Sequence, residues 1–326
     1  MAVKIVRQPN KIAIIGAPSS AAAFLPGSEK APAALRAAGI VQRLQSIGYE
    51  VTDLGDCEPR VFAEDDEHKR SRNVPEIIAS LNDLKPRVEL GIKSGALLLV
   101  LGGDCTQILA MVAGARRYYK QIGLLWLDRD ADLNSPSTTP SGRLDGMALA
   151  GIVGKGSPEL VRFWGEPPLV REPDTLIYGL VRVDEPERDF LTRSPLRHVY
   201  AVDIQLKGAE KSAQDAITHL HAGTREFMVH VDLDAIAQEE FAAVNVPDSG
   251  GLSFAEVQTS LTEFVKQKNL LGLDIAQYNP DRDSDGSGAR KLVDLLAEIL
   301  SARYTALVPP APAATPAPED ATSAPA

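Results

Sequence analysis

Short runs of apolar residues, separated by longer amphipathic segments, are the feature that most constrains the fold of this chain. Within each run nearly every residue is apolar, rather than every second one, which is typical of strands covered by helices on both faces. Alternation of such strands with helices predicts βα units and a parallel sheet. The predicted strands are Lys11–Gly16, Ala96–Leu101, Gly123–Leu127, Thr175–Leu180, Glu226–Val231 and Leu270–Ile275.

Helical periodicity marks segments between and after these strands. Ala31–Ile47 has an apolar stripe and is followed by Gly48, a residue that often ends helices. Ser253 and Glu256 have the spacing of a capping box, which predicts that another helix begins there. Ala289–Tyr304 carries leucine and isoleucine at helical spacing. We expect these helices to pack on the sheet.

Composition predicts one large domain followed by a tail. The chain has 326 residues, of which 44% are apolar, so a sizeable core can be buried. No break in composition divides residues 1–308, whereas residues 309–326 are mostly proline, alanine and small polar residues. Because such a segment has no large apolar side chain that could dock on a core, we expect this tail to be disordered.

Charge and cysteine content restrict the partners and the compartment. The chain has 44 acidic against 34 basic residues, and this disfavours nucleic acid, since phosphate binding needs a concentrated positive surface. Two cysteines, Cys57 and Cys105, do not imply a disulfide framework. The first residues lack the apolar region of a signal peptide, and no apolar run approaches the roughly 20 residues of a membrane span. We therefore expect a cytoplasmic protein with a small-molecule substrate and no membrane partner.

Carboxylates gather directly after several predicted strands, where ligands bind in open α/β sheets. Alternate residues of an extended backbone share a face, so each D-x-D pair is expected to project to one side. Unpaired carboxylates in a partly buried cleft repel one another, and hard divalent ions such as Mg²⁺, Ca²⁺ and Mn²⁺ relieve this by binding their oxygens. The pattern therefore predicts a cation site. The residues concerned are Asp104, Cys105, Asp128, Asp130, Asp132, His230, Asp232 and Asp234.

Each of these residues also has a simpler structural interpretation. A single D-x-D is often a solvated loop or a helix cap. Cys105 alone is more often a small buried apolar residue, and His230 alone is more often a histidine that hydrogen-bonds the adjacent strand or loop. Two D-x-D pairs together with a Gly-Gly-Asp strand end favour the cation site. His230 stays open as a ligand, a partner of a ligand or a proton shuttle.

At these loops the sequence resembles the ureohydrolase family, and arginases more closely than agmatinases. The resemblance runs from Lys11 to about Asp283 and includes KIAIIGAP, LLLVLGGDCT, LLWLDRDADLNSPSTTPSGRLDGMALAG, VHVDLDAI and LLGLDIAQYNPDRD. It implies an α/β fold, a three-layer αβα domain with an eight-stranded parallel sheet, assembled into trimers or hexamers. It also implies two Mn²⁺ ions, with other hard divalent ions possible, that activate a water for attack on a guanidinium carbon.

The resemblance also assigns residues to the metal site. Where the family has histidines, this chain has Cys105, Asp130 and Asp145. Cys105 and Asp130 would then complete the metal shells, while Asp145, His230 and Asp130 are the candidate catalytic groups that would move protons. The family's metal-binding aspartates are all kept, as Asp128, Asp132, Asp232 and Asp234.

Several positions that recognise an amino acid in arginases are also kept. Asn134, Ser141 and Asp184 match residues that hold the α-carboxylate and α-amino groups, whereas Arg143 replaces an asparagine. Arg143 could pair with a substrate carboxylate, or it could form a salt bridge with Asp145 or a neighbouring acid. These two interpretations remain open.

Two functions follow from this pattern. The first is a divergent metal-dependent hydrolase that acts on a guanidino, ureido or amide-like C–N bond of an amino-acid-like substrate. Gln277 replaces the glutamate that pairs with the guanidinium, and a neutral amide disfavours L-arginine itself. The second is a catalytically silent arginase-like protein with a binding or regulatory role, which loss of the family histidines would also produce. The kept aspartates and the added carboxylate of Asp130 favour the enzyme.

Overall fold

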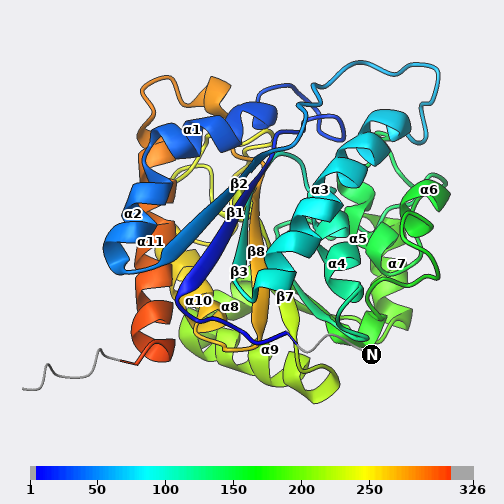
Figure 1. Cartoon of the computed structure of the whole chain (residues 1–326). Coiled ribbons are helices and arrows are strands. Elements are labelled where there is room, and N and C mark those ends of the chain that lie inside the picture. Colours follow the sequence, from blue (N-terminus) through cyan, green and yellow to red (C-terminus); the bar gives the residue numbers. More distant parts are fainter. Residues whose placement is uncertain (1–4, 310–326) are drawn as a thin grey trace, which may run out of the picture.

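The computed structural model of the chain describes residues 5–309 and is built around an eight-stranded parallel sheet. The strands lie in the order β2-β1-β3-β8-β7-β4-β5-β6 (Figure 1). This confirms the predicted α/β fold. The strands are Lys11–Ala17 (β1), Glu50–Asp56 (β2), Leu97–Gly102 (β3), Gly123–Leu127 (β4), Thr175–Leu180 (β5), Arg197–Tyr200 (β6), Phe227–Asp232 (β7) and Leu270–Ala276 (β8).

Helices form the two outer layers (Figure 1). One face of the sheet is covered by α3 to α7, and the other by α1, α2 and α8 to α11. The confirmed architecture is therefore a three-layer αβα sandwich. The helices are Ala31–Ala37 (α1), Ile40–Ile47 (α2), Val74–Ser94 (α3), Gln107–Arg116 (α4), Ala148–Ile152 (α5), Pro158–Val161 (α6), Glu185–Arg193 (α7), Ala201–Lys207 (α8), Ala209–Gly223 (α9), Phe254–Val265 (α10) and Ser287–Leu307 (α11).

The core divides into two clusters, one on each face of the sheet. In β3, Leu97, Leu99 and Leu101 join the cluster beneath α10 and α11, whereas Leu98 and Val100 join the cluster beneath α3 and α4. Successive side chains of a strand point to opposite faces, so both sets must be apolar when both faces are covered. This explains why the inner strands read as continuous apolar runs.

The structure corrects one predicted helix and supports another. The segment Ala31–Ile47 forms two helices, because Gly39 between them has a φ of 91°, a left-handed conformation that interrupts the helix. The capping box of Ser253 and Glu256 is present, with α10 beginning at Phe254 as predicted. Of the predicted tail, residues 310–326 lie outside the described part of the chain.

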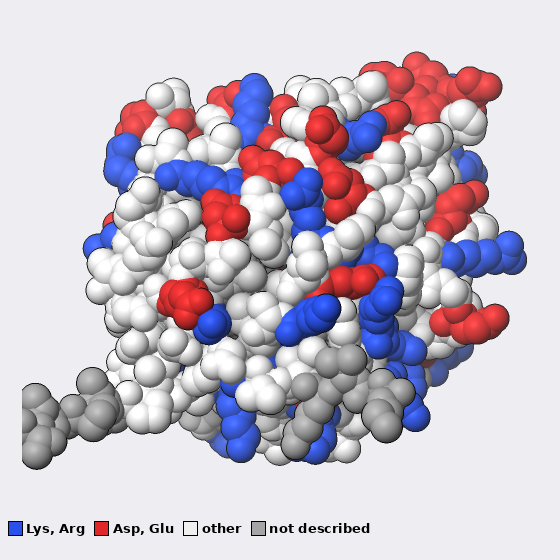
Figure 2. All heavy atoms as spheres, viewed as in Figure 1, with Lys and Arg blue, Asp and Glu red and all other residues white. Residues whose placement is uncertain are grey.

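Charged side chains of both signs are interspersed over the face drawn in Figure 2. Acidic side chains gather along its upper edge, where the loop after β2 carries the exposed Glu64, Asp66 and Glu67. The backbone and side chain of Arg72, further along this loop, hydrogen-bond the carbonyls of Gly142 and Ser141, so the loop packs against the segment after β4. Within residues 5–309, no helix combines the length and apolar character that crossing a bilayer requires.

Candidate metal centre

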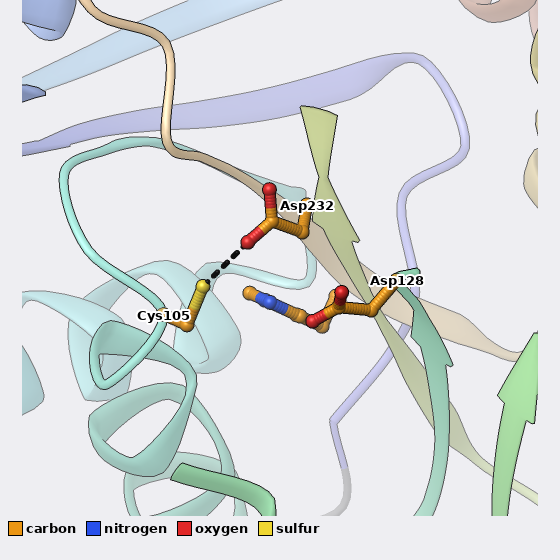
Figure 3. Close-up of side chains that lie close together, drawn as sticks. Cys105, Asp128 and Asp232 are labelled. Carbon is orange, nitrogen blue, oxygen red and sulfur yellow. Dashed lines mark hydrogen bonds between the residues drawn. The ribbon is translucent and has the colours of Figure 1, made fainter. Parts of the chain in front are cut away.

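The site lies at the carboxyl ends of neighbouring central strands. Asp128 follows β4 and Asp232 ends β7, and the pairing of Leu127 with Val231 places these two aspartates at the same level. Cys105 comes from the loop after β3. Figure 3 shows its thiol and the two carboxylates pointing toward one another. Three segments far apart in the sequence thus meet at one point because their strands are parallel and lie close together at the centre of the sheet, with β8 between β3 and β7.

The Gly-Gly-Asp turn brings Cys105 to this point. A Cβ added to Gly103 would lie 2.5 Å from the carbonyl oxygens of both Ala17 and Ser19, so only glycine fits this approach of two loops. Asp104 itself is used structurally: Ser19 Oγ donates to its Oδ2 over 2.6 Å, and the backbone N–H of Thr106 donates to its Oδ1 over 3.1 Å. The motif therefore builds the loop, and its next residue faces the site.

A first group of potential cation ligands consists of Cys105, Asp128, His230 and Asp232. One ligand atom from each lies within 4.8 Å of all the others, and all four residues are buried. Cys105 Sγ donates to Asp232 Oδ2 over 2.8 Å. Nε2 of His230 has no hydrogen-bond partner among the described residues, although the side chain is fully buried. Because a buried polar atom without a partner is unfavourable, a cation would satisfy this one.

A second group consists of Asp128, Asp130 and Asp234, and one carboxylate oxygen from each lies within 4.8 Å of the other two. Asp128 belongs to both groups and is therefore placed to bridge two ions. Oδ1 of Asp234 is buried and has no hydrogen-bond partner in the described part of the chain. Both oxygens of Asp130 are paired with Arg182. Oxygen donors of this kind suit hard divalent ions.

Asp132 lines the same cavity but lies outside both groups at that distance. Its φ is 51°, and that of Gln277, also in the cavity wall, is 68°. Left-handed conformations cost roughly 1–3 kcal/mol for residues other than glycine and concentrate at functional sites. The backbone N–H of Gln277 donates to the carbonyl of Gly103, which ties the end of β8 to the Gly-Gly-Asp turn.

The pKa values of the acids in the site are raised. Burial is the largest cause, and repulsion between neighbouring carboxylates comes next. The pKa values of Asp128, Asp132 and Asp232 are raised well above the ordinary range. Burial also raises the pKa of Asp234 to about 8 and that of Asp145 to about 6. Burial is likewise the main cause of the raised pKa of the Cys105 thiol. The negative charges thus lack compensation, and bound cations would supply it. The donor set and the unpartnered atoms fit a pair of divalent ions.

A cavity of about 300 Å³ opens above the carboxylates. Four of the residues predicted to bind substrate line it: Asn134, Ser141, Asp184 and Gln277. Asn134 donates to Asp184 over 2.9 Å. Asp145 also lines the cavity, where it accepts hydrogen bonds from the Gln277 amide and from the backbone N–H of Cys105.

Arg143 is placed differently from the other predicted substrate-binding residues. Its guanidinium donates to both carboxylate oxygens of Glu64, at 3.0 and 3.1 Å, and stacks over Phe62 at 4.5 Å. Its partner is therefore an acid on the loop after β2, and not Asp145. This arrangement favours the salt-bridge interpretation, in which Arg143 fastens that loop beside the cavity.

Two residues of the site were not singled out from the sequence. Arg182 follows β5 and lines the cavity, where it holds Asp130. Asp274 lies within β8 and accepts from His230 Nδ1 over 2.9 Å. Arg182 stands at a strand end, as the predicted aspartates do, and that position was a usable signal. Asp274 is one acid inside an apolar strand, which is itself an anomaly that points to a buried partner.

Comparisons with known proteins agree with the fold of the chain. The family model described as the arginase family matches residues 10–301. Arginase from Brevibacillus brevis is 30% identical over 291 residues, covering 88% of this chain and 97% of that protein. The structure is similar to arginase from Bacillus cereus (TM-score 0.80, 28% identity, 89% and 98% of the two chains) and to arginase from Bacillus caldovelox (TM-score 0.81, 26% identity, 89% and 98%). The chain belongs to the arginase family.

Proposed function

We propose that the chain is a divergent metal-dependent hydrolase that cleaves a guanidino, ureido or amide-like C–N bond in an amino-acid-like substrate. The observation that carries this proposal is the pair of overlapping ligand groups that share Asp128 at the floor of the cavity. When bound, divalent ions in these groups would lower the pKa of a coordinated water and polarise the bond to be cleaved. Cys105, Asp128, His230 and Asp232 would hold one ion, and Asp128, Asp130 and Asp234 the other.

The protein's own side chains would orient the substrate beside this centre. Gln277 uses its amide nitrogen on Asp145, which leaves its Oε1 without a partner among the described residues and able to accept an N–H from a substrate. Asp145 holds a position between Gln277 and the Cys105 backbone, from which it could carry a proton to a leaving amine. A neutral acceptor in place of a carboxylate favours ureido or amide groups over a cationic guanidinium.

Three further side chains in the cavity wall suit the polar end of an amino acid. Asn134, Ser141 and Asp184 present an amide, a hydroxyl and a carboxylate there. The carboxylate of Asp184 would pair with an α-ammonium group, and the amide and hydroxyl can hydrogen-bond an α-carboxylate. A cavity of about 300 Å³ matches a small-molecule substrate.

The test combines metal analysis with a substrate screen. Protein stripped of metal is reloaded with Mn²⁺, with Zn²⁺ or with both, its bound metal is measured, and urea and ammonia release is followed across guanidino and ureido acids. We expect a stoichiometric ion pair and release from at least one of these acids. Asp128→Ala removes the shared ligand and is expected to abolish both, whereas the exposed Asp189→Ala on α7 is the matched control and is expected to retain both.

Two results would contradict the proposal in different ways. Protein that binds no stoichiometric metal and releases nothing would instead be a silent family member with a binding role. If Asp128→Ala still released urea or ammonia at the rate of the control variant, catalysis would take place elsewhere on the molecule.

A further inference from the structure

We infer that the two cation positions differ in chemistry: the first selects a borderline-soft ion such as Zn²⁺ or Co²⁺, and the second takes a hard ion such as Mn²⁺ or Mg²⁺. This inference rests on the proposed metal centre and specifies which kind of ion each of its two positions binds. The first position offers one sulfur, one imidazole nitrogen and two carboxylates, from Cys105, His230, Asp128 and Asp232. The second offers carboxylate oxygens only, from Asp128, Asp130 and Asp234.

The donor types decide the preference. Zn²⁺ is bound in proteins by thiolate, imidazole and carboxylate, typically in four-coordinate sites, and the first position supplies four such donors. Nitrogen and sulfur donors favour Zn²⁺ and Co²⁺ over Mn²⁺, which stands at the weak end of the order of divalent affinities. The resemblance to the family implies Mn²⁺ at both positions, but it implies this for a site with imidazoles and without a thiol. Here the side chains point to a mixed pair.

His230 is the least expected of these donors, and its surroundings fit a ligand. Its Nδ1 lies 2.9 Å from Asp274 Oδ2, and Gln107 Nε2 donates to the same oxygen over 2.9 Å. His230 and Asp274 are both fully buried. An Nδ1–H donated to the carboxylate leaves Nε2 with a free lone pair, which is the form that a metal needs. A carboxylate behind a histidine is the usual arrangement that fixes the tautomer and the ring of a metal ligand.

The sheet register fixes the direction in which this ring points. His230 pairs with Asp274 on β8 and with Trp126 on β4, so it lies between the two. Its ring lies over that of Trp126, with centroids 3.9 Å apart, and the Trp126 indole N–H donates to Asp128 Oδ2 over 2.9 Å. One tryptophan thus positions both the imidazole and the bridging carboxylate. Asp232, two residues after His230 on the same strand, shares its face.

Cys105 completes the position from the opposite side. In the structure its Sγ donates to Asp232 Oδ2 over 2.8 Å, and Figure 3 shows the thiol, Asp128 and Asp232 converging. When a divalent ion binds, the sulfur–hydrogen bond breaks, its electron pair goes to the ion, and the proton leaves to solvent. Loading of the first position is therefore expected to form a metal–thiolate bond, which the all-carboxylate position cannot form and which absorption of the Co²⁺ form detects.

The experiment compares metal occupancy in wild type and variants. Metal-free full-length protein is given one Zn²⁺ per chain and dialysed against excess Mn²⁺, and its bound metals are counted; a second sample is titrated with Co²⁺ and followed by absorption. We expect one Zn²⁺ per chain beside a hard ion, and a sulfur-to-cobalt charge-transfer band.

Variants test the individual ligands. Cys105→Ser is expected to remove the band, and His230→Asn is expected to weaken Zn²⁺ binding. Asp274→Asn, which acts through His230, is expected to weaken it roughly 10–100-fold. His198→Gln, on β6, is the matched control and is expected to change nothing.

The wild-type measurements test the inference even if a variant fails to fold. Two Mn²⁺ per chain in the competition, or a Co²⁺ form without a charge-transfer band, would overturn it. Hydrolysis by a protein with Mn²⁺ at both positions would refute this inference and leave the proposed function standing. A protein that takes Zn²⁺ and Mn²⁺ as described, but hydrolyses no guanidino or ureido acid, would refute the proposed function and leave the inference standing.

Discussion

The guanidinium of Arg182 holds both carboxylate oxygens of Asp130: Nε donates to Oδ1 and Nη2 donates to Oδ2, each over 2.7 Å. The two residues also form an isolated β-bridge, so β4 and β5 bring them together just beyond the strand ends. Burial raises the pKa of Asp130, and the charge of Arg182 opposes this shift. Arg182 therefore competes with a cation for a carboxylate that stands where the resemblance to the family implies an imidazole.

Removal of this competitor is expected to strengthen binding at the second position. In Arg182→Ala, Asp130 loses its partner and a positive charge leaves the cavity, so both effects favour a cation. The side chain of Arg182 is 52% exposed, and exposed ion pairs contribute at most about 1 kcal/mol, so we expect a gain of roughly two- to fivefold in Mn²⁺ affinity. Calorimetric titration measures it, with Arg193→Ala on α7 as control. A weaker affinity in Arg182→Ala would show that the arginine helps to position Asp130 instead.

The inner strands could be predicted from the sequence because both of their faces are apolar, but the edges could not. In β2 every side chain is exposed or half-buried, and β6, at the other edge, has only four residues, Arg197–Tyr200, without an apolar run. Such strands form because a neighbouring strand pairs with them, and their own residues give little indication of a strand in the sequence. The break at Gly39 was missed for a related reason, since helical periodicity continues across it.

The site shows the same division between local pattern and tertiary pairing. Asp128, Asp232 and Asp234 stand at strand ends, and the D-x-D spacing was enough to group them. The pairing of His230 with Asp274 depends on the register of β7 against β8, which no local pattern specifies. The pairing of Asp130 with Arg182 depends likewise on the adjacency of β4 and β5. Sequence thus predicted that Asp128, Asp130, Asp232 and Asp234 gather, and the fold determined which partner each one has.

Asp232→Asn is expected to have opposite effects with and without metal. In metal-free protein the substitution removes one of several repelling buried carboxylates, and we expect the melting temperature to rise by about 2–4 °C, as for roughly 1 kcal/mol. With Zn²⁺ at about 100 times its Kd, wild type gains about 2.7 kcal/mol of stability, and the variant is expected to lose most of this gain. Thermal unfolding in both buffers tests the pair of effects, with the exposed Asp189→Asn as control. Equal responses to Zn²⁺ in wild type and Asp232→Asn would remove Asp232 from the site.

Glu187 is expected to make stability depend on pH. Its carboxylate accepts from the backbone N–H groups of Asp184 and Leu133, and burial raises its pKa to about 7. A raised folded pKa means that the folded state binds the proton more tightly than the unfolded state. The contribution of Glu187 to stability is then fully present below about pH 4.5, its unfolded pKa, and is lost as pH rises through about 7.

Glu187→Gln isolates this contribution, because glutamine keeps an acceptor at the same place in the capping box. We expect the melting temperature of metal-free wild type to fall more steeply between pH 5 and about 8 than that of the variant. The difference between the two curves cancels the titration of the aspartate cluster, which both proteins share. Parallel curves would show that Glu187 is ionised throughout this range.

Gln277→Glu tests whether the amide at this position excludes a cationic substrate. Gln277 donates its amide nitrogen to Asp145, so glutamate there would place two carboxylates together, and we expect the single variant to melt at a lower temperature than wild type. Adding Asp145→His replaces the repulsion with an ion pair and is expected to recover the stability.

In this double variant the new carboxylate of residue 277 can also pair with a guanidinium. A charge-assisted hydrogen bond is worth about 1.5–3 kcal/mol, so we expect kcat/KM for L-arginine to rise roughly 10–100-fold. Urea release measures the change, and Gln214→Glu, exposed on α9, controls for added charge. If the double variant binds its metals and melts like wild type but shows no gain on L-arginine, position 277 does not set the preference between neutral and cationic substrates.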